Sequence, residues 1–300
     1  MTQPDFIVAP DWILPAEPAD KVLENHAVLV ANGKILDITT QDAARQGWPD
    51  AQWHERPGHV LMPGLINTHT HAAMSLFRGY ADDLPLQTWL EKHIWPAEGR
   101  WVNREWVRDG PDLASLEQSR GATTCIQDMT LVPDDVAAVA AERGNRAVAS
   151  LIVIEAPTVW ASSIDEYINQ GLEVHAKYQG HPLVNAAFAP HAPYTVGDDA
   201  LNQIVTLANQ LETTIQMHIH ETADEVRTAT ESSGMSPLQR LDRLGILSPL
   251  LNAVHMTQLT REEIELCAER GLSVIHCPES NMKLASGGCP VNDLQKAGIN

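Results

Sequence analysis

Two histidines separated by a single residue, His69 and His71, form the strongest local chemical signal in the sequence. They end the run Pro63-Gly-Leu-Ile-Asn-Thr, which is typical of a strand, and alternate residues of a strand point to the same side. Two neutral imidazoles at this separation suit a borderline divalent metal such as zinc. The same spacing also occurs by chance on surface strands, so the pair alone leaves a metal site and a plain surface strand equally open.

A second signal, His218-Ile-His220-Glu221, ends an apolar run further along the chain. His218 is a candidate third ligand, and Glu221 follows just beyond the strand, where a loop carboxylate can reach a metal-bound water. His220 points the same way as His218 by strand parity, so it is a rival ligand, although we favour a packing role for it. His255 is weak evidence by itself, but it comes at the same end of the next strand candidate.

The elements that must position these side chains alternate between short apolar runs and helical stretches. Such alternation predicts a parallel sheet, and nearly continuous apolar strands predict burial on both faces. The strand candidates are Gly64–Asn67, Thr123–Gln127, Ala147–Ile154, Val184–Ala189, Thr214–Ile219, Ala253–His255 and Ser273–Ile275. The helical stretches include Asp134–Arg143, Ala200–Leu211 and Arg261–Arg270.

Seven such strands are one fewer than a closed (β/α) barrel needs. Ala297-Gly298-Ile299-Asn300 is typical of a helix end that leads into a strand, so we expect the sequence to stop just before an eighth strand. The barrel therefore takes residues 63–300 and is expected to be incomplete at its C-terminus. An open doubly wound sheet is the structural alternative. Residues 1–62 contain short strand candidates and an Asn32-Gly33 hairpin turn, which predict a small β-rich domain.

Composition restricts the partners. The formal net charge of −19 disfavours binding to nucleic acid or to an anionic membrane, because both would be repelled. The N-terminus shows no secretory signal and the apolar runs are too short to span a bilayer, so we expect a cytoplasmic protein. The four cysteines form no CxxC pair, so free thiols are favoured over zinc ligation by cysteine.

Six motifs, in order along the chain, resemble the amidohydrolase superfamily and, within it, the 5′-methylthioadenosine/S-adenosylhomocysteine deaminase family. They are Pro63-Gly-Leu-Ile-Asn-Thr-His-Thr-His, Met74-Ser-Leu-Phe-Arg-Gly, His93-Ile-Trp-Pro-Ala-Glu98, Ala189-Pro-His191-Ala-Pro-Tyr, His218-Ile-His-Glu221 and His276-Cys-Pro-Glu-Ser-Asn-Met-Lys-Leu-Ala-Ser-Gly. The resemblance implies an α/β fold, namely a TIM-type (β/α)8 barrel of the metal-dependent hydrolase kind, with a small N-terminal β-domain that is part of a β-sandwich.

The resemblance also implies a role for each matching position. His69, His71 and His218 would bind one divalent metal, typically zinc, with a fourth ligand, an aspartate, expected beyond residue 300. Glu221 would shuttle a proton to the purine ring nitrogen and His255 would orient the attacking hydroxide. The substrate-binding residues would be Glu98 at the ribose hydroxyls and His191 at the purine or nucleoside edge, together with Glu221.

One absence narrows the metal site. Binuclear members of the superfamily bridge two metals with a modified lysine near the end of the fourth strand, and Val184–Thr195 contains no lysine. We therefore expect a mononuclear site.

Ser280 and Asn281 are expected to shape a loop by bonding to turn backbone.

The resulting hypothesis is a hydrolytic deaminase of 6-aminopurine nucleosides, acting first on 5′-methylthioadenosine and second on S-adenosylhomocysteine. A related deaminase of guanine, cytosine or a triazine ring is one alternative. A non-catalytic barrel scaffold is an alternative of another class. The expected partner is a small purine nucleoside, and we also expect a homo-oligomer.

Overall fold

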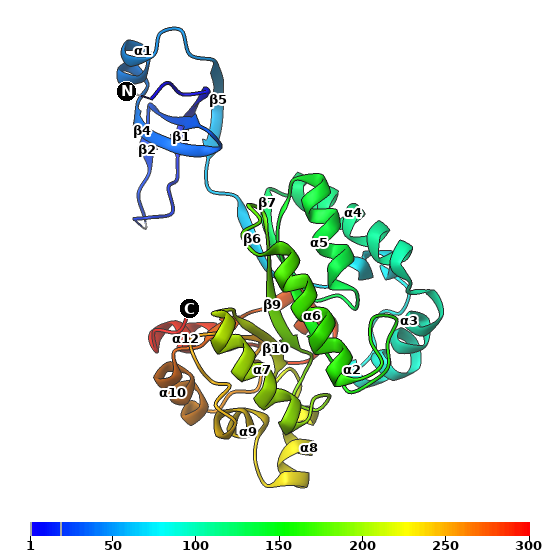
Figure 1. Ribbon diagram of the computed structural model, residues 1–300. Helices are drawn as coiled ribbons and strands as arrows, with labels where there is room; N and C mark the ends of the chain where they lie inside the picture. Colours follow the sequence, from blue (N-terminus) through cyan, green and yellow to red (C-terminus); the bar gives the residue numbers. More distant parts are fainter. Residues whose placement is uncertain (1, 19) are drawn as a thin grey trace. The chain divides into compact units, whose positions relative to one another are not determined.

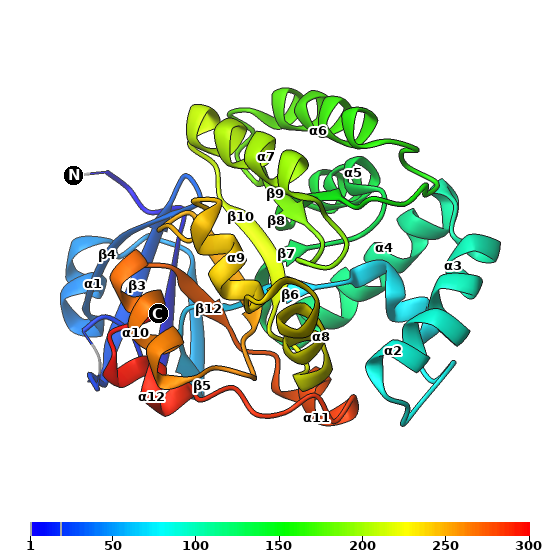
Figure 2. The ribbon, with the colours of Figure 1, turned by 90° about the horizontal axis from the view of Figure 1, so that it is seen from below.

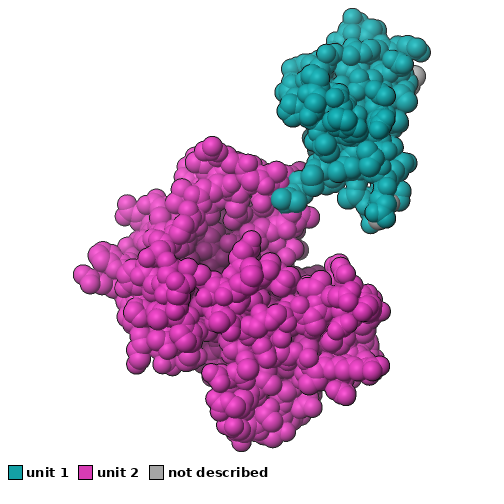
Figure 3. Space-filling model, turned by 180° about the vertical axis from the view of Figure 1, so that it is seen from behind, with its two compact units in different colours: residues 1–65 teal, residues 66–300 magenta. Residues whose placement is uncertain are grey.

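The structure is a computed structural model that describes residues 2–18 and 20–300. The chain forms two compact units, residues 1–65 and residues 66–300 (Figures 1 and 3). Each unit has its own sheet. Within the described ranges, no helix combines the length and the apolar composition that crossing a bilayer requires.

The first unit is a five-stranded sheet with one short helix. The strand order is β2-β1-β3-β4, and β5 pairs with β1. Asn32 and Gly33 have φ values of 51° and 71°, so the predicted hairpin turn between β3 and β4 is confirmed. The bounds are β1 Phe6–Ile13, β2 Leu23–Glu24, β3 His26–Ala31, β4 Lys34–Thr40, α1 Gln41–Gly47 and β5 Trp53–Leu61.

Strand β5 is not among the predicted strands, because Pro57-Gly58 is typical of a turn. The structure accommodates this pair through a register shift in the parallel pairing of β1 with β5. The backbone N–H of Gly58 donates to Asp11 Oδ2 at 2.8 Å, so a side chain replaces the missing ladder bond.

The second unit is a seven-stranded sheet whose spatial order follows the chain, from β6 to β12. The registers of successive strands from β7 to β12 are parallel. All seven predicted strands are present, and the predicted fold, a nearly closed parallel barrel with a small N-terminal β-domain, is confirmed. The bounds are β6 Leu65–Thr70, β7 Thr123–Asp128, β8 Arg146–Val153, β9 Val184–Pro190, β10 Ile215–Ile219, β11 Leu251–His255 and β12 Ser273–Ile275.

Helices flank the outer side of these strands (Figure 2). Thr260 and Glu263 form a capping box at the start of α10, and Gly271 ends that helix with a φ of 70°. The bounds are the 3₁₀ helix η1 Ala72–Phe77, α2 Leu86–Trp89, the π-helix η2 Leu90–Ile94, α3 Trp95–Trp101, α4 Arg104–Arg120, α5 Pro133–Arg143, α6 Ile164–Tyr178, α7 Asp198–Leu211, α8 Ala223–Ser233, α9 Pro237–Arg243, α10 Arg261–Arg270, α11 Pro278–Lys283 and α12 Val291–Lys296.

The core of the second unit lies between the strands and these helices. Its largest fully buried side chains include Tyr167, Phe188 and Met217. Helix α4 approaches η1 so closely that a Cβ on Gly110 would lie 2.5 Å from Ala73 Cα. The glycine therefore sets how closely α4 packs against the segment that follows His71.

Candidate metal and catalytic site

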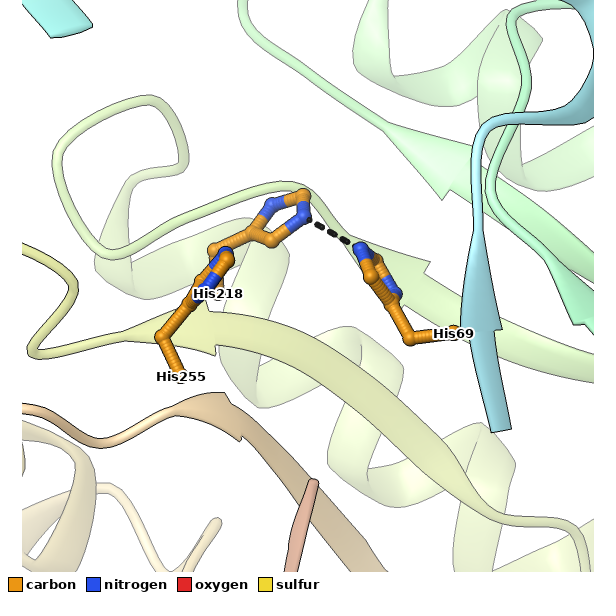
Figure 4. Close-up of side chains that lie close together, drawn as sticks. All are labelled: His69, His218 and His255. Atoms are coloured by element: carbon orange, nitrogen blue, oxygen red, sulfur yellow. Dashed lines mark hydrogen bonds between the residues drawn. The ribbon is translucent and has the colours of Figure 1, made fainter. Parts of the chain in front are cut away.

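The candidate residues gather at the carboxyl ends of the parallel strands. His69 lies in β6, His71 follows that strand directly, and His218 lies in β10. His255 is the last residue of β11, and His191 directly follows β9. Figure 4 shows the imidazoles of His69, His218 and His255 facing a common space. The strand ends thus bring together residues that are far apart in the sequence.

Three imidazoles point their Nε2 atoms toward one another. His218 Nε2 lies 3.1 Å from His69 Nε2 and 3.3 Å from His71 Nε2. By distance alone, His255 also qualifies as a ligand, because one nitrogen each of His69, His218 and His255 lie within 4.8 Å of one another. The structure therefore offers two overlapping sets of three imidazoles, His69 with His71 and His218, and His69 with His218 and His255.

An oxygen atom holds the far nitrogen of each of the three predicted ligands. His69 Nδ1 lies 3.0 Å from Gln216 Oε1, and His71 Nδ1 lies 2.6 Å from the Met129 carbonyl oxygen. His218 Nδ1 lies 2.9 Å from the His191 carbonyl oxygen. These oxygens accept hydrogen bonds, so each Nδ1 carries the proton and each Nε2 presents a lone pair.

This arrangement fits a divalent cation. Neighbouring lone pairs at these distances repel unless a positive charge lies between them, and imidazole nitrogens suit zinc. Burial lowers the pKa of His69, His71 and His218, and neighbouring imidazoles contribute to the lowering for His69 and His218. Neutral imidazoles are the form that binds metal.

Glu221 lies beside this cluster, with its Oε1 atom 3.6 Å from His255 Nε2. Burial raises the pKa of Glu221 to about 8, and the nearby Glu225 carboxylate adds to the rise. A buried carboxyl group beside the three imidazoles is placed to act as a general acid and base. His255 has a φ of 78°, a left-handed conformation that is costly for a residue other than glycine and that occurs at functional sites.

The backbone of Glu221 is held from two sides. Its N–H donates to Glu225 Oε2 at 2.8 Å, and its carbonyl oxygen accepts from Thr257 Oγ1 at 2.8 Å. Glu225 Oε1 also accepts from the N–H of His220 at 3.1 Å. The backbone of the turn after β10, from which the Glu221 side chain extends, is thus held in position.

His220, which strand parity makes an alternative metal ligand, is held by hydrogen bonds to other parts of the protein. Its Nδ1 lies 2.9 Å from the Gln258 carbonyl oxygen, and its Nε2 accepts from the N–H of Leu238 at 3.3 Å. Both ring nitrogens therefore have protein partners, and the side chain is fully buried. This geometry favours the packing role over ligation.

A cavity of about 1240 Å³ adjoins the cluster, and Glu98 and His191 line it together with His69 and Glu221. Burial raises the pKa of Glu98, in α3, to about 7. His191 Nδ1 lies 3.0 Å from Thr195 Oγ1, and burial lowers the pKa of His191 to about 4. The structure thus brings both predicted substrate-binding residues to the same cavity as the metal-ligand candidates.

Several residues that support the site were not predicted from the sequence, or were predicted in another role. Gln216, Met129 and Glu225 were not singled out. No sequence pattern identifies Met129 or Glu225 as the partner of a site residue. Asn281 was expected to bond turn backbone, but its side chain contacts His255 instead, with Nδ2 3.0 Å from Nδ1. The parity of Gln216 with His218 on β10 was the one available signal.

Known proteins match this chain along its whole length. Residues 60–300 match the amidohydrolase family. A 5-methylthioadenosine/S-adenosylhomocysteine deaminase of Saccharophagus degradans is 46% identical over 299 residues, which are 100% of this chain and 67% of that protein. A 5′-deoxyadenosine deaminase of Methanopyrus kandleri is 39% identical over 286 residues, which are 94% of this chain and 65% of that protein.

A solved structure agrees with these relatives. It is an adenosine deaminase of Xanthomonas campestris with bound zinc, with a TM-score of 0.97 and 48% sequence identity, and the match covers 100% of this chain and 68% of that one. The chain spans about two thirds of the length of the relatives it matches. The family match and the two sequence relatives lead to one conclusion: the chain belongs to the amidohydrolase family.

Proposed function

We propose that this chain is a hydrolytic deaminase of adenosine-type nucleosides, with 5′-methylthioadenosine as the first substrate and S-adenosylhomocysteine as the second. The observation that carries the proposal is Glu221, a buried carboxyl group 3.6 Å from His255 and beside three converging imidazoles. The names of the relatives, which are deaminases of adenosine-type nucleosides, support the substrate class.

One divalent metal ion, zinc by the chemistry of the ligands, would be held by His69, His71 and His218. A bound divalent ion supplies Lewis acidity, which lowers the pKa of a coordinated water from 15.7 to about 7. The hydrogen bonds on the three Nδ1 atoms keep the ligands neutral and oriented. A fourth ligand beyond residue 300 stays a prediction.

Glu221 moves the protons of the reaction. Its carboxylate accepts a proton from the attacking water and delivers it to the purine ring nitrogen beside the reacting carbon. A second proton passes to the amino group, which leaves as ammonia while the carbon keeps the oxygen. The position of Glu221 beside His255 and the imidazole cluster lets one carboxyl group serve both proton transfers.

The remaining residues orient the substrate. His255 faces Glu221 and would hold the oxygen as it adds to the ring. Glu98, in the same cavity, would accept hydrogen bonds from the ribose hydroxyls, and His191 would contact the purine or nucleoside edge. The division of the chain at residue 62, the homo-oligomer and the cytoplasmic location stay predictions.

An ammonia-release assay tests the proposal. Purified full-length protein, loaded with zinc, is offered methylthioadenosine, S-adenosylhomocysteine, adenosine, guanine and cytosine. We expect release from the nucleosides, loss of release after chelation and recovery when zinc is added back. Activity on free bases alone would overturn the nucleoside assignment. No release from any substrate by zinc-loaded protein would favour a non-catalytic scaffold.

A further inference from the structure

The four imidazoles of the cluster are not equivalent in where they carry their protons. His69, His71 and His218 each direct Nδ1 at an oxygen atom that can only accept. The orientation of the Gln216 amide is itself fixed, because its Nε2 donates to the Thr68 carbonyl oxygen at 2.8 Å. All three rings therefore present an unprotonated Nε2 to the common space.

His255 has the opposite arrangement. Its Nδ1 lies 3.0 Å from Asn281 Nδ2, which is an amide nitrogen and can only donate. In this orientation of the amide, Nδ1 of His255 is the acceptor, and in the neutral ring the proton lies on Nε2. Both side chains are buried, with exposed fractions of 4% for His255 and 2% for Asn281, so water does not readily replace the bond.

The backbone of Asn281 fixes where the side chain begins, and the contact with His255 is the one hydrogen bond that its amide makes within the described residues, because the buried Oδ1 atom has no partner there. The residue lies in α11, where its N–H donates to the Cys277 carbonyl oxygen at 3.0 Å. Its own carbonyl oxygen accepts from the N–H of Ser286 at 2.9 Å. Both backbone groups are thus tied to α11 and to the loop that follows, and the side chain extends toward the end of β11.

We propose that Asn281 is a positioning residue that keeps the proton of His255 on Nε2, so that His255 is a hydrogen-bond donor rather than a fourth imidazole ligand. The Nε2–H group then faces Glu221 and the space where an oxygen would add to the substrate. By the distances between ring nitrogens, His255 could be counted among the metal ligands. The hydrogen bond from Asn281 distinguishes it from them, because it leaves the proton of His255 on the nitrogen that faces the cluster. The consequence for turnover rests on the proposed deaminase function, but the position of the proton does not.

The direct test is the protonation of the His255 ring in metal-free protein. Protein labelled with [15N]histidine is examined by 15N–1H correlation of the ring nitrogens, and the His255 signals are assigned with a His255→Gln variant. We expect a protonated Nε2 and an unprotonated Nδ1. A protonated Nδ1 in the wild-type protein would overturn the proposal, whatever the activity of the enzyme.

Two substitutions of similar size extend the test. Asn281→Asp offers an acceptor in place of the donor, so Nδ1 of His255 should become protonated. Asn281→Leu removes the donor, so the ring should populate both protonation forms. We expect kcat to fall by about 10–100-fold in both variants with KM unchanged, as for other partners that orient site histidines. A spectrum of Asn281→Asp identical to that of wild type would contradict the assignment.

Zinc affinity supplies a further readout. In Asn281→Asp, Nε2 of His255 becomes a free lone pair beside the cluster, so zinc should bind more tightly in a chelator competition. Met282→Ala is the matched control, because Met282 is on the same helix with an exposed fraction of 73%. The control should match wild type in spectrum, zinc affinity and kcat. Unchanged zinc affinity in Asn281→Asp would count against the proposal.

Discussion

His69 Nε2 and His218 Nε2 lie 3.1 Å apart, and neither atom carries a proton that could join them. The protons are on the far side of each ring, directed at Gln216 Oε1 and at the His191 carbonyl oxygen. The protein therefore holds two lone pairs against each other at hydrogen-bond distance. A cation between them would turn this repulsion into ligation, which leads to the first prediction.

Zinc should stabilise the folded protein, because it binds a site that exists only in the folded chain. At a free zinc concentration of 1000 times Kd, the free energy of unfolding should rise by about 4 kcal/mol. Thermal unfolding of chelator-stripped protein, with and without added zinc, measures the effect. His69→Gln should lose most of the stabilisation, whereas His59→Gln, a change at an exposed histidine of the first unit, should keep it. Equal stabilisation of both variants would exclude His69 as a ligand.

Glu98→Gln should stabilise the protein at alkaline pH. Burial raises the pKa of Glu98 to about 7 in the folded protein, whereas the carboxyl group of the unfolded chain titrates near 4.5. Folding therefore takes up a proton between these pH values, and wild-type stability falls as the pH rises through this window. Glutamine carries no such penalty.

Urea unfolding of both proteins at several pH values measures the difference. Glu98→Gln should be the more stable protein at pH 8, and its advantage should shrink as the pH falls toward 4.5. An advantage that does not change with pH would mean that folding does not raise the pKa of Glu98.

Gly110→Ala should destabilise the fold, because the added Cβ would lie 2.5 Å from Ala73 Cα and 2.6 Å from Ala73 O. Overpacking of this kind costs about 1–3 kcal/mol. Ala73 is two residues from His71, so zinc affinity should also fall. Gly47→Ala is the control: this helical glycine has nothing within 4 Å of an added Cβ. Wild-type stability in Gly110→Ala would show that α4 and η1 separate without cost.

Much of the barrel was predictable, because a strand buried on both faces is a nearly unbroken apolar run. The run Val184–Ala189 was predicted, and the observed strand β9 is Val184–Pro190. Strand β5 was not predictable in the same way. Its Pro57-Gly58 pair is acceptable only because Asp11 on the neighbouring strand bonds the Gly58 N–H, and local sequence does not show that contact.

The candidate site, like the fold, was predictable only in part. The carboxyl ends of parallel strands lie at the same end of a barrel. His69, His71 and His218 could therefore be grouped from the alternation of side chains along each strand and from the order of the strands in the sequence. The direction of each ring depends on a partner from another element, such as the Met129 carbonyl oxygen for His71. Asn281 contacts His255 across 26 positions of the sequence, and the spacing of motifs carries no information about that bond.

The central claim is that Glu221 transfers protons beside a metal held by three histidines. The most direct measurement is the turnover of methylthioadenosine by zinc-loaded Glu221→Gln, with its metal content determined in the same sample. The glutamine keeps the shape of the side chain but cannot accept a proton, so kcat should fall by about 10²–10⁴-fold while zinc stays bound. Turnover equal to that of wild type, at equal zinc content, would contradict the account.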